Sequence, residues 1–402
     1  MTMLKAPFPY AGGKSRVAAY VWSRLGDCPN YVEPFFGSGA VLLGRPEAHE
    51  WWDRTETVND KDGLLANFWR AVQAAPEDVA RWADWPVNEN DLHARHSWLV
   101  GRNDSLQARL EGDPGYYDAQ VAGWWVWGIC CWIGGQWCNT KGPWVVGEDA
   151  EGYAVLGKRG DFAAAEGDGV KRQLPHLSDA GQGIHRKLPH LGAGVGIHRQ
   201  RPHLGAGVGI HRQLPHLGDA GRGHCDAWRD HTTATMQALS DRIRRVRVCC
   251  GDWARVLGPT PTYLRGLTAV FLDPPYSHAE RDANLYTTET DCAADVLEWC
   301  RENGDNPLLR IALCGYEGEH DVLAAEHGWS VFAWRAQGGY AHLGNGRGKA
   351  NVHRERIWFS PACLPDATGT DANTSEGQPT LFEDVALETA PDAGQFAMEV
   401  EP

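Results

Sequence analysis

The sequence has 402 residues, of which 43% are apolar and 19 are tryptophans. This composition excludes a wholly disordered chain and suffices for one large domain or two ordinary ones. The net charge of −14 excludes a uniformly basic surface, but residues 365–402 hold nine acidic residues and no Lys or Arg, whereas nine Lys or Arg oppose three Asp between residues 171 and 229.

Short β-rich runs alternate with helical stretches along most of the chain. The expected strands contain residues 31–32, 57–58, 246–248, 269–272, 308–313, 331–334 and 356–359. The expected helices cover residues 16–25, 64–74, 232–246 and 292–302, and the tryptophan-rich run 121–133, too short to span a membrane, is expected to form a buried helix. This alternation predicts an α/β fold with a mostly parallel, Rossmann-like sheet. The last two strands are expected to form an antiparallel terminal hairpin that adds an antiparallel edge strand.

The alternating pattern is interrupted between residues 76 and 229, which indicates a long insertion. It divides the expected α/β domain into residues 1–75 and residues 230–364. Within it, residues 174–224 contain four Leu/Arg-Pro-His-Leu units that begin at Leu174, Leu188, Arg201 and Leu214. Their period is too short for a helical solenoid, and Pro and Gly favour turns. The acidic tail, residues 365–402, is expected to be disordered.

The first candidate motif is Tyr10-Ala-Gly-Gly-Lys14-Ser. It superficially resembles a phosphate-binding loop. That loop requires a glycine where this chain has Phe8, so a nucleotide triphosphatase is rejected.

A glycine-containing turn follows the expected strand at residues 31–32. Its sequence is Glu33-Pro-Phe35-Phe-Gly37-Ser-Gly39. Such glycines let the backbone approach a nucleoside-like ligand closely. It is not the dinucleotide fingerprint, because Leu42 stands where that fingerprint has Gly, and a tight strand-to-helix turn would use the same residues.

An acidic residue, Asp60, ends the next expected strand, about 20 residues beyond the glycine turn. An acid in this place often accepts hydrogen bonds from ribose hydroxyls. The alternative is a cap for the helix that follows.

The sharpest signal is Asp273-Pro274-Pro275-Tyr276, directly after the apolar run at residues 269–272. It predicts a carboxylate at the carboxyl edge of a parallel sheet, where open α/β sheets bind ligands. Prolines stiffen the loop and leave carbonyls without partners. Acceptors and an aromatic ring suit an exocyclic amine on a planar base, although an ordinary strand-ending turn is the alternative.

The ordered set of these four motifs resembles the Dam-type (D12 class) DNA adenine-N6 methyltransferases, some of them phage-encoded. The resemblance covers residues 7–68 and 246–361, with Tyr10 where many relatives have Trp. It implies a class I S-adenosylmethionine-dependent methyltransferase fold with a long inserted target-recognition region. It also implies S-adenosylmethionine as the cofactor, bound by Tyr10, Lys14, Glu33, Phe35, Gly37, Gly39, Asp60, Asp252 and Asp273, and catalysis by Asp273, Pro274, Pro275 and Tyr276.

The implied reaction is site-specific methylation of adenine N6 in double-stranded DNA, without a metal. The target base would leave the duplex, stack on Tyr276, and donate its amine hydrogens to Asp273 and the Pro274 carbonyl. One alternative is methylation of another planar amine, such as cytosine N4 or a glutamine amide, although those families usually have Ser or Asn in place of Asp273. The other is a catalytically silent DNA-binding or decoy protein, which would not need S-adenosylmethionine.

Two further segments suggest partners. Basic residues beside the repeats could contact DNA phosphates; a spacer without function is the alternative, and histidines without paired cysteines match no closed zinc site. In the tail, Gln378-Pro-Thr-Leu381-Phe382 resembles the short peptides that bind the bacterial sliding clamp, with chance similarity as the alternative.

The eleven cysteines include two adjacent pairs and no C-x-x-C spacing. This usage favours reduced thiols and a cytoplasmic location, and the resemblance places the protein in a bacterial host cell. The first ten residues lack the pattern of a secretory signal peptide, and no membrane partner is expected.

Overall fold

The computed structural model describes residues 4–10, 12–46, 54–132, 137–138, 144–148, 154–158, 226–276, 292–334 and 353–366. The repeats at residues 174–224 and the tail beyond residue 366 lie outside these ranges. The expectations about turns, disorder and partners in those two segments therefore stay predictions.

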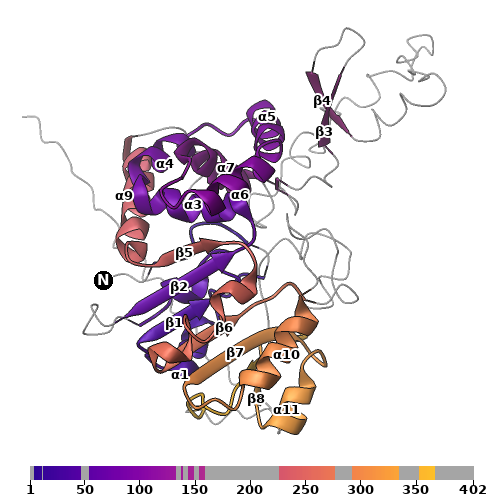
Figure 1. Ribbon diagram of the computed structural model, residues 1–402. Coiled ribbons are helices and arrows are strands. Elements are labelled where there is room, and N and C mark those ends of the chain that lie inside the picture. The colour runs from indigo at the N-terminus through magenta and orange to yellow at the C-terminus, as the bar shows by residue number, and fades with distance from the viewer. Residues whose placement is uncertain are drawn as a thin grey trace, which may run out of the picture.

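A seven-stranded sheet forms the centre of the described part of the molecule (Figure 1). The spatial order of its strands is β5-β2-β1-β6-β7-β9-β8. In chain order they are β1 (Asn30–Glu33), β2 (Thr55–Asp60), β5 (Arg247–Cys250), β6 (Thr268–Leu272), β7 (Leu309–Tyr316), β8 (Ser330–Ala333) and β9 (Glu355–Phe359). In the spatial order, the first five strands, β5, β2, β1, β6 and β7, are parallel to one another. This arrangement confirms the expected α/β fold with a mostly parallel sheet.

The strand order reverses between β1 and β6. The chain passes outward from β1 to β2 and β5, and it then returns to the other side of β1 for β6 and β7. In this register Val32 lies opposite Thr57 on one side and Val270 on the other. Open α/β sheets bind ligands outside the carboxyl ends of their strands at such a reversal, so the topology points to the ends of β1 and β6.

The last two strands pair as the expected antiparallel hairpin, and this hairpin forms one edge of the sheet. β9 lies between β7 and β8 and is antiparallel to both, so the edge strand is β8. Ile357, Trp358 and Phe359 of β9 are fully buried, whereas β8 is only partly covered, as an inner and an edge position require.

Both faces of the sheet are buried. Along β6, Ala269 and Phe271 pack into one core, and Val270 and Leu272 pack into the other. This two-sided burial explains why the strand is a continuous apolar run rather than an alternating one. The first core includes residues of α1 (Ala18–Leu25), α2 (Ala40–Leu43) and α3 (Gly63–Ala74), and the second those of the 3-10 helix η6 (Trp253–Val256), α10 (Ala293–Asn303) and α11 (Asp321–His327).

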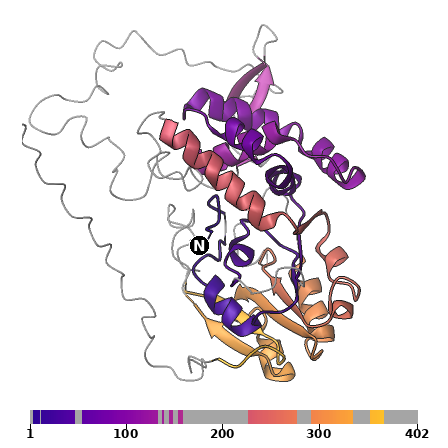
Figure 2. The same ribbon diagram turned by 90° about the vertical axis from the view of Figure 1, so that its left-hand side faces the viewer.

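Helices gather beside β5 at one end of the sheet (Figure 1). They are α4 (Pro76–Ala83), α5 (Glu89–Val100), α6 (Asn103–Gly112), α7 (Ala119–Cys131) and α9 (Asp226–Ile243). Figure 2 shows α9 lying along this group, where it packs on α3 and α4. A separate pair of antiparallel strands, β3 (Trp144–Glu148) and β4 (Ala154–Lys158), was not predicted. A short 3-10 helix, η7 (Tyr263–Arg265), precedes β6.

Local signals explain where several helices begin. The side chains of Asp62, Asn88 and Asp118 each accept a backbone N–H from the first turn of α3, α5 and α7, which satisfies a donor that the helix cannot pair internally. The tryptophan-rich helix expected near residues 121–133 is confirmed as α7. Its Trp125 and Trp127 are almost fully buried.

Candidate functional site

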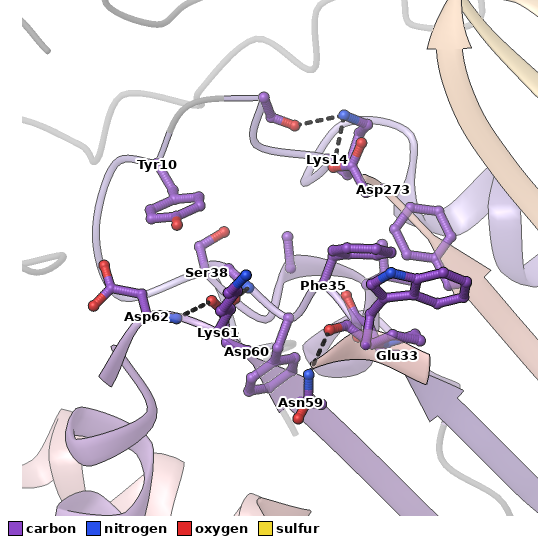
Figure 3. Close-up of a pocket in the computed structure, with 18 of the residues that line it drawn as sticks. Tyr10, Lys14, Glu33, Phe35, Ser38, Asn59, Asp60, Lys61, Asp62 and Asp273 are labelled. Atoms are coloured by element: carbon purple, nitrogen blue, oxygen red, sulfur yellow. Dashed lines mark hydrogen bonds and ion pairs between the residues drawn. The ribbon is translucent and has the colours of Figure 1, made fainter. Parts of the chain in front are cut away.

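A pocket lies at the carboxyl ends of β1, β2, β5 and β6, where the strand order reverses (Figure 3). It contains about 860 Å³ of empty space, a figure that includes open solvent at its mouth. Gly39, Asp252, Pro274 and Tyr276 are not part of its wall. Eight of the residues singled out from the sequence do line the pocket: Tyr10, Lys14, Glu33, Phe35, Gly37, Asp60, Asp273 and Pro275.

The turn after β1 needs both of its glycines. Gly37 and Gly39 have φ angles of 49° and 69°, in the left-handed region that glycine tolerates best. A Cβ on Gly37 would lie 3.0 Å from the Tyr10 ring, and a Cβ on Gly39 would lie 2.9 Å from the Phe36 ring. Gly37 thus lets Tyr10 pack directly on the backbone at the pocket, while Gly39 starts α2 against the core.

Asp60 ends β2 and fixes the glycine turn. Its two carboxylate oxygens each accept a backbone N–H at 3.0 Å, one from Gly37 and one from Asp62. Burial raises the pKa of Asp60 to about 7, although the backbone hydrogen bonds oppose this shift. Asp62, and not Asp60, caps α3, so the helix-cap alternative is wrong. Carboxylate oxygens have two lone pairs each, so Asp60 can still accept a ligand hydroxyl.

Lys14 and Asp273 bring the first and last motifs together. The Lys14 Nζ lies 2.9 Å from Asp273 Oδ2 and donates to the Gly12 carbonyl at 2.7 Å and the Tyr276 hydroxyl at 3.1 Å. Burial lowers the pKa of Lys14, but the Asp273 and Glu355 carboxylates outweigh it and hold the pKa above its usual value. A permanent cation therefore lies beside the Asp273 carboxylate.

Tyr276 is buried behind this ion pair, with 8% of its surface exposed. Its hydroxyl donates to Glu355 Oε2 at 2.7 Å and lies 3.3 Å from Asp273 Oδ1. Its ring meets Tyr316 edge-on at 4.5 Å between centroids. Burial and the two carboxylates raise the pKa of Tyr276, which keeps the phenol protonated. The ring would have to leave this position in order to stack on a base.

Aromatic surface lines the pocket beside the β1 turn and the end of β5. Phe35 and Trp253 are nearly parallel, at 26° and 6.2 Å between centroids, and both line the pocket. The neighbouring Asp252 is exposed, and its carboxylate accepts the Ala254 N–H to begin η6. This part of the wall therefore offers flat rings, while the Asp252 carboxylate is engaged in a helix cap.

Glu33 supplies a buried carboxyl group to the pocket. The Tyr31 hydroxyl donates to Glu33 Oε2 at 2.8 Å. Burial, together with the nearby Asp273 charge, raises the pKa of Glu33 well above its usual range in spite of the Tyr31 hydrogen bond. This favours the protonated form, which can donate as well as accept a hydrogen bond.

Two residues of the site were missed by sequence reasoning, Glu355 and Trp253. Glu355 begins the buried strand β9 and is 7% exposed. The only signal was a carboxylate at the start of the apolar run Glu355-Arg-Ile-Trp-Phe. Trp253 follows directly after Asp252, so the carboxylate was singled out and the ring beside it was not.

Asn59, next to Asp60, ties two turns of the pocket together. Its side-chain amide donates to the Pro34 carbonyl at 3.1 Å and to the Gly251 carbonyl at 3.0 Å. These bonds join the turn after β1 to the turn after β5. The pocket is therefore braced across three adjacent strands.

Within the described residues, no three His, Cys, Asp or Glu side chains are grouped so that they could hold a metal ion. No helix in the same ranges has both the length and the apolarity needed to cross a membrane. Gln378, Leu381 and Phe382 lie outside the described residues. Comparison of the sequence with models of known protein families, and with curated proteins, finds no match.

Proposed function

We propose that this protein is a class I S-adenosylmethionine-dependent methyltransferase that methylates N6 of adenine in DNA. The observation that carries the proposal is the meeting of the Lys14–Asp273 ion pair, the Gly37 turn and Asp60 in one pocket at the strand reversal. A mostly parallel seven-stranded sheet with one antiparallel strand near its edge supports this class.

The residues of the pocket fit the chemical groups of S-adenosylmethionine. Phe35 and Trp253 offer flat surface to a purine, and Asp60 offers carboxylate oxygens to ribose hydroxyls. The glycine at position 37 lets the Tyr10 ring pack on the backbone at the edge of this space. S-adenosylmethionine supplies the methyl group as a cationic sulfonium and leaves as a neutral thioether.

The residues after β6 fit the amine that would accept the methyl group. Asp273 and the Pro274 carbonyl can each accept one amine hydrogen, which orients the nitrogen lone pair and increases its electron density. The nitrogen gains the methyl carbon and loses one proton, which the Asp273 carboxylate can accept before it passes to water. The contribution of the chain is positioning and electrostatics.

Families that methylate cytosine N4 or a glutamine amide usually have Ser or Asn in place of Asp273. The Asp at this position therefore favours adenine N6 as the acceptor. DNA as the substrate rests on the resemblance and on the basic residues between 171 and 229. The decoy alternative is favoured by no specific contact, because a decoy would have no use for a pocket that suits a nucleoside.

The test is methylation by the purified protein of unmethylated double-stranded DNA with S-adenosylmethionine carrying a labelled methyl group. The nucleosides released by digestion are then separated and identified by mass spectrometry. Label in N6-methyl-2′-deoxyadenosine supports the proposal, and label in N4-methyl-2′-deoxycytidine or in protein supports the other amines. Absence of both transfer and cofactor binding by calorimetry would support the decoy.

A further inference from the structure

Glu355 is a strongly buried carboxylate that contacts the site from β9, on the β6–β7 side of the sheet reversal. It begins β9, the strand next to β7, and its Oε2 accepts the Tyr276 hydroxyl at 2.7 Å. The side chain belongs to none of the motifs that were singled out. It nevertheless shares one hydrogen-bonded cluster with Lys14, Asp273 and Tyr276.

The charged and titratable groups around Glu355 come from three segments of the chain. Lys14 is the cation from the N-terminal segment, Asp273 and the Tyr276 phenol come from the loop after β6, and the Cys314 thiol and Glu319 come from β7 and the turn beyond it. With Glu355 ionised, one cation faces two carboxylates in the immediate cluster. With Glu355 neutral, Lys14 and Asp273 cancel.

We infer that Glu355 is the positioning residue of this site, and that its carboxylate both holds the Tyr276 hydroxyl and leaves the Lys14–Asp273 pair with a net negative charge. This inference rests on the proposed function. A cationic methyl donor and an amine that becomes positive during transfer are both stabilised by a cluster with a net negative charge. The cluster has that charge when Glu355 is ionised and has none when Glu355 is neutral.

The test compares three variants with the wild-type protein. Glu355→Gln keeps the shape and an oxygen acceptor for Tyr276 but removes the charge, while Glu355→Asp keeps the charge on a shorter side chain. Glu298→Gln is the matched control, because Glu298 is exposed on α10 and pairs with Arg301 in the same helix. Single-turnover methyl transfer is measured from pH 5 to 9 with saturating cofactor and DNA.

We expect Glu355→Gln to transfer methyl at least about tenfold more slowly at pH 8, with binding of DNA changed by less than about twofold. Burial raises the pKa of Glu355 above the usual value of about 4.3. The wild-type rate should therefore fall as the pH drops through that raised pKa, and this fall is the acid limb of the pH–rate profile. The acid limb should move to lower pH in Glu355→Gln. It should persist in Glu355→Asp.

The unliganded protein gives a readout that is independent of activity. A raised pKa in the folded state means that the protonated form favours folding, and that this stabilisation is lost as the pH rises through the folded-state pKa. The melting temperature of Glu355→Gln relative to wild type should therefore be higher at pH 8 than at pH 5. A difference that does not vary with pH would indicate only a structural hydrogen bond and would overturn the inference.

Two kinetic outcomes separate the inference from the proposed function. Wild-type transfer with an unchanged rate and acid limb in Glu355→Gln overturns the inference alone. Wild-type protein that transfers no methyl group overturns the proposed function, and the inference with it. If Glu355→Gln does not fold, Glu355→Asp still tests the inference, because it keeps the charge. Disappearance of the fall in rate at low pH in Glu355→Asp would then overturn the inference.

Discussion

The Lys14 ammonium lies 2.9 Å from the Asp273 carboxylate, and the two side chains are 4% and 20% exposed. The contact joins the loop before α1 to the loop after β6 across the strand reversal. Because Lys14 is almost fully buried, Asp273 both presents a carboxylate to the pocket and compensates a cation. Any substitution of Asp273 therefore affects chemistry and folding together.

Asp273→Asn should abolish most methyl transfer while leaving much of the affinity for DNA. The side-chain amide of Asn has no negative charge, so it cannot replace the carboxylate as the acceptor of both the amine hydrogen and the Lys14 proton. A loss of about 4 kcal/mol of transition-state stabilisation would slow transfer roughly a thousandfold. Retention of more than a few per cent of the wild-type rate on adenine N6 would sink the assignment.

The control for this variant is the double variant Lys14→Gln with Asp273→Asn. Removing one member of a buried ion pair costs about 3–5 kcal/mol of folding free energy, whereas replacing both costs less. Urea unfolding should show the double variant more stable than Asp273→Asn. Methyl transfer should nevertheless stay low in both, which separates the catalytic from the structural effect.

Tyr276→Ala should impair methyl transfer far more than Tyr276→Phe. Phe keeps a ring that can stack on a base, worth about 1–3 kcal/mol, and loses the hydroxyl contacts with Glu355, Lys14 and Asp273. The comparison is made as kcat/KM on one duplex, with melting temperatures as the folding control. Equal defects in the two variants would show that Tyr276 acts through its hydroxyl and not by stacking. That outcome would agree with the buried position of its ring.

The motifs that meet at the pocket were predictable because they follow parallel strands. Gly37, Asp60 and Asp273 come after β1, β2 and β6, and the carboxyl ends of parallel strands share one edge of a sheet. The alternation of apolar strands with helices likewise predicted a parallel sheet packed against helices. Local sequence thus carried both the fold class and most of the pocket wall.

The remainder depended on tertiary packing that local sequence does not encode. Glu355 reaches the site because β9 is inserted between β7 and β8. The sequence pattern indicated the final hairpin but not the order of its two strands in the sheet. Helices α5 and α6 show little segregation of apolar residues onto one face, so their period gave no signal. They are held by packing on α7 and α3.

The affinity for S-adenosylmethionine should depend on pH through Asp60, whose pKa is about 7 in the unliganded pocket. Ligand hydroxyls bind the ionised carboxylate better, so binding should tighten as the pH rises, by roughly tenfold between pH 6 and pH 8. Calorimetric titration of wild type and Asp60→Asn over that range provides the measurement. The variant should bind more weakly and lose most of this dependence; an identical pH profile would show that Asp60 does not face the ligand.

A stability prediction concerns Glu56, which clasps two arginines at the opposite end of β2. Arg45 Nη1 lies 3.0 Å from Glu56 Oε1, and Arg242 donates to both carboxylate oxygens at 2.8 and 2.9 Å. These contacts connect β2 to the residues after α2 and to the last turn of α9. Burial raises the pKa of Glu56, but the two guanidinium groups outweigh it and hold the pKa below its usual value.

Glu56→Gln should therefore lower the free energy of unfolding at pH 7 by about 3–5 kcal/mol, because Arg45, whose side chain is fully buried, would lose its buried carboxylate partner and keep its ion pair with the exposed Asp27. A lowered folded-state pKa gives stability that is present above the unfolded value of about 4.3 and is lost as the pH falls through the folded value. The gap between wild type and variant in urea unfolding should thus narrow below about pH 4. Glu326→Gln, at an exposed position on α11, is the control and should change stability by less than about 0.5 kcal/mol. A gap under about 1 kcal/mol at pH 7, or one that does not change with pH, would mean that the clasp is no stronger than a surface ion pair.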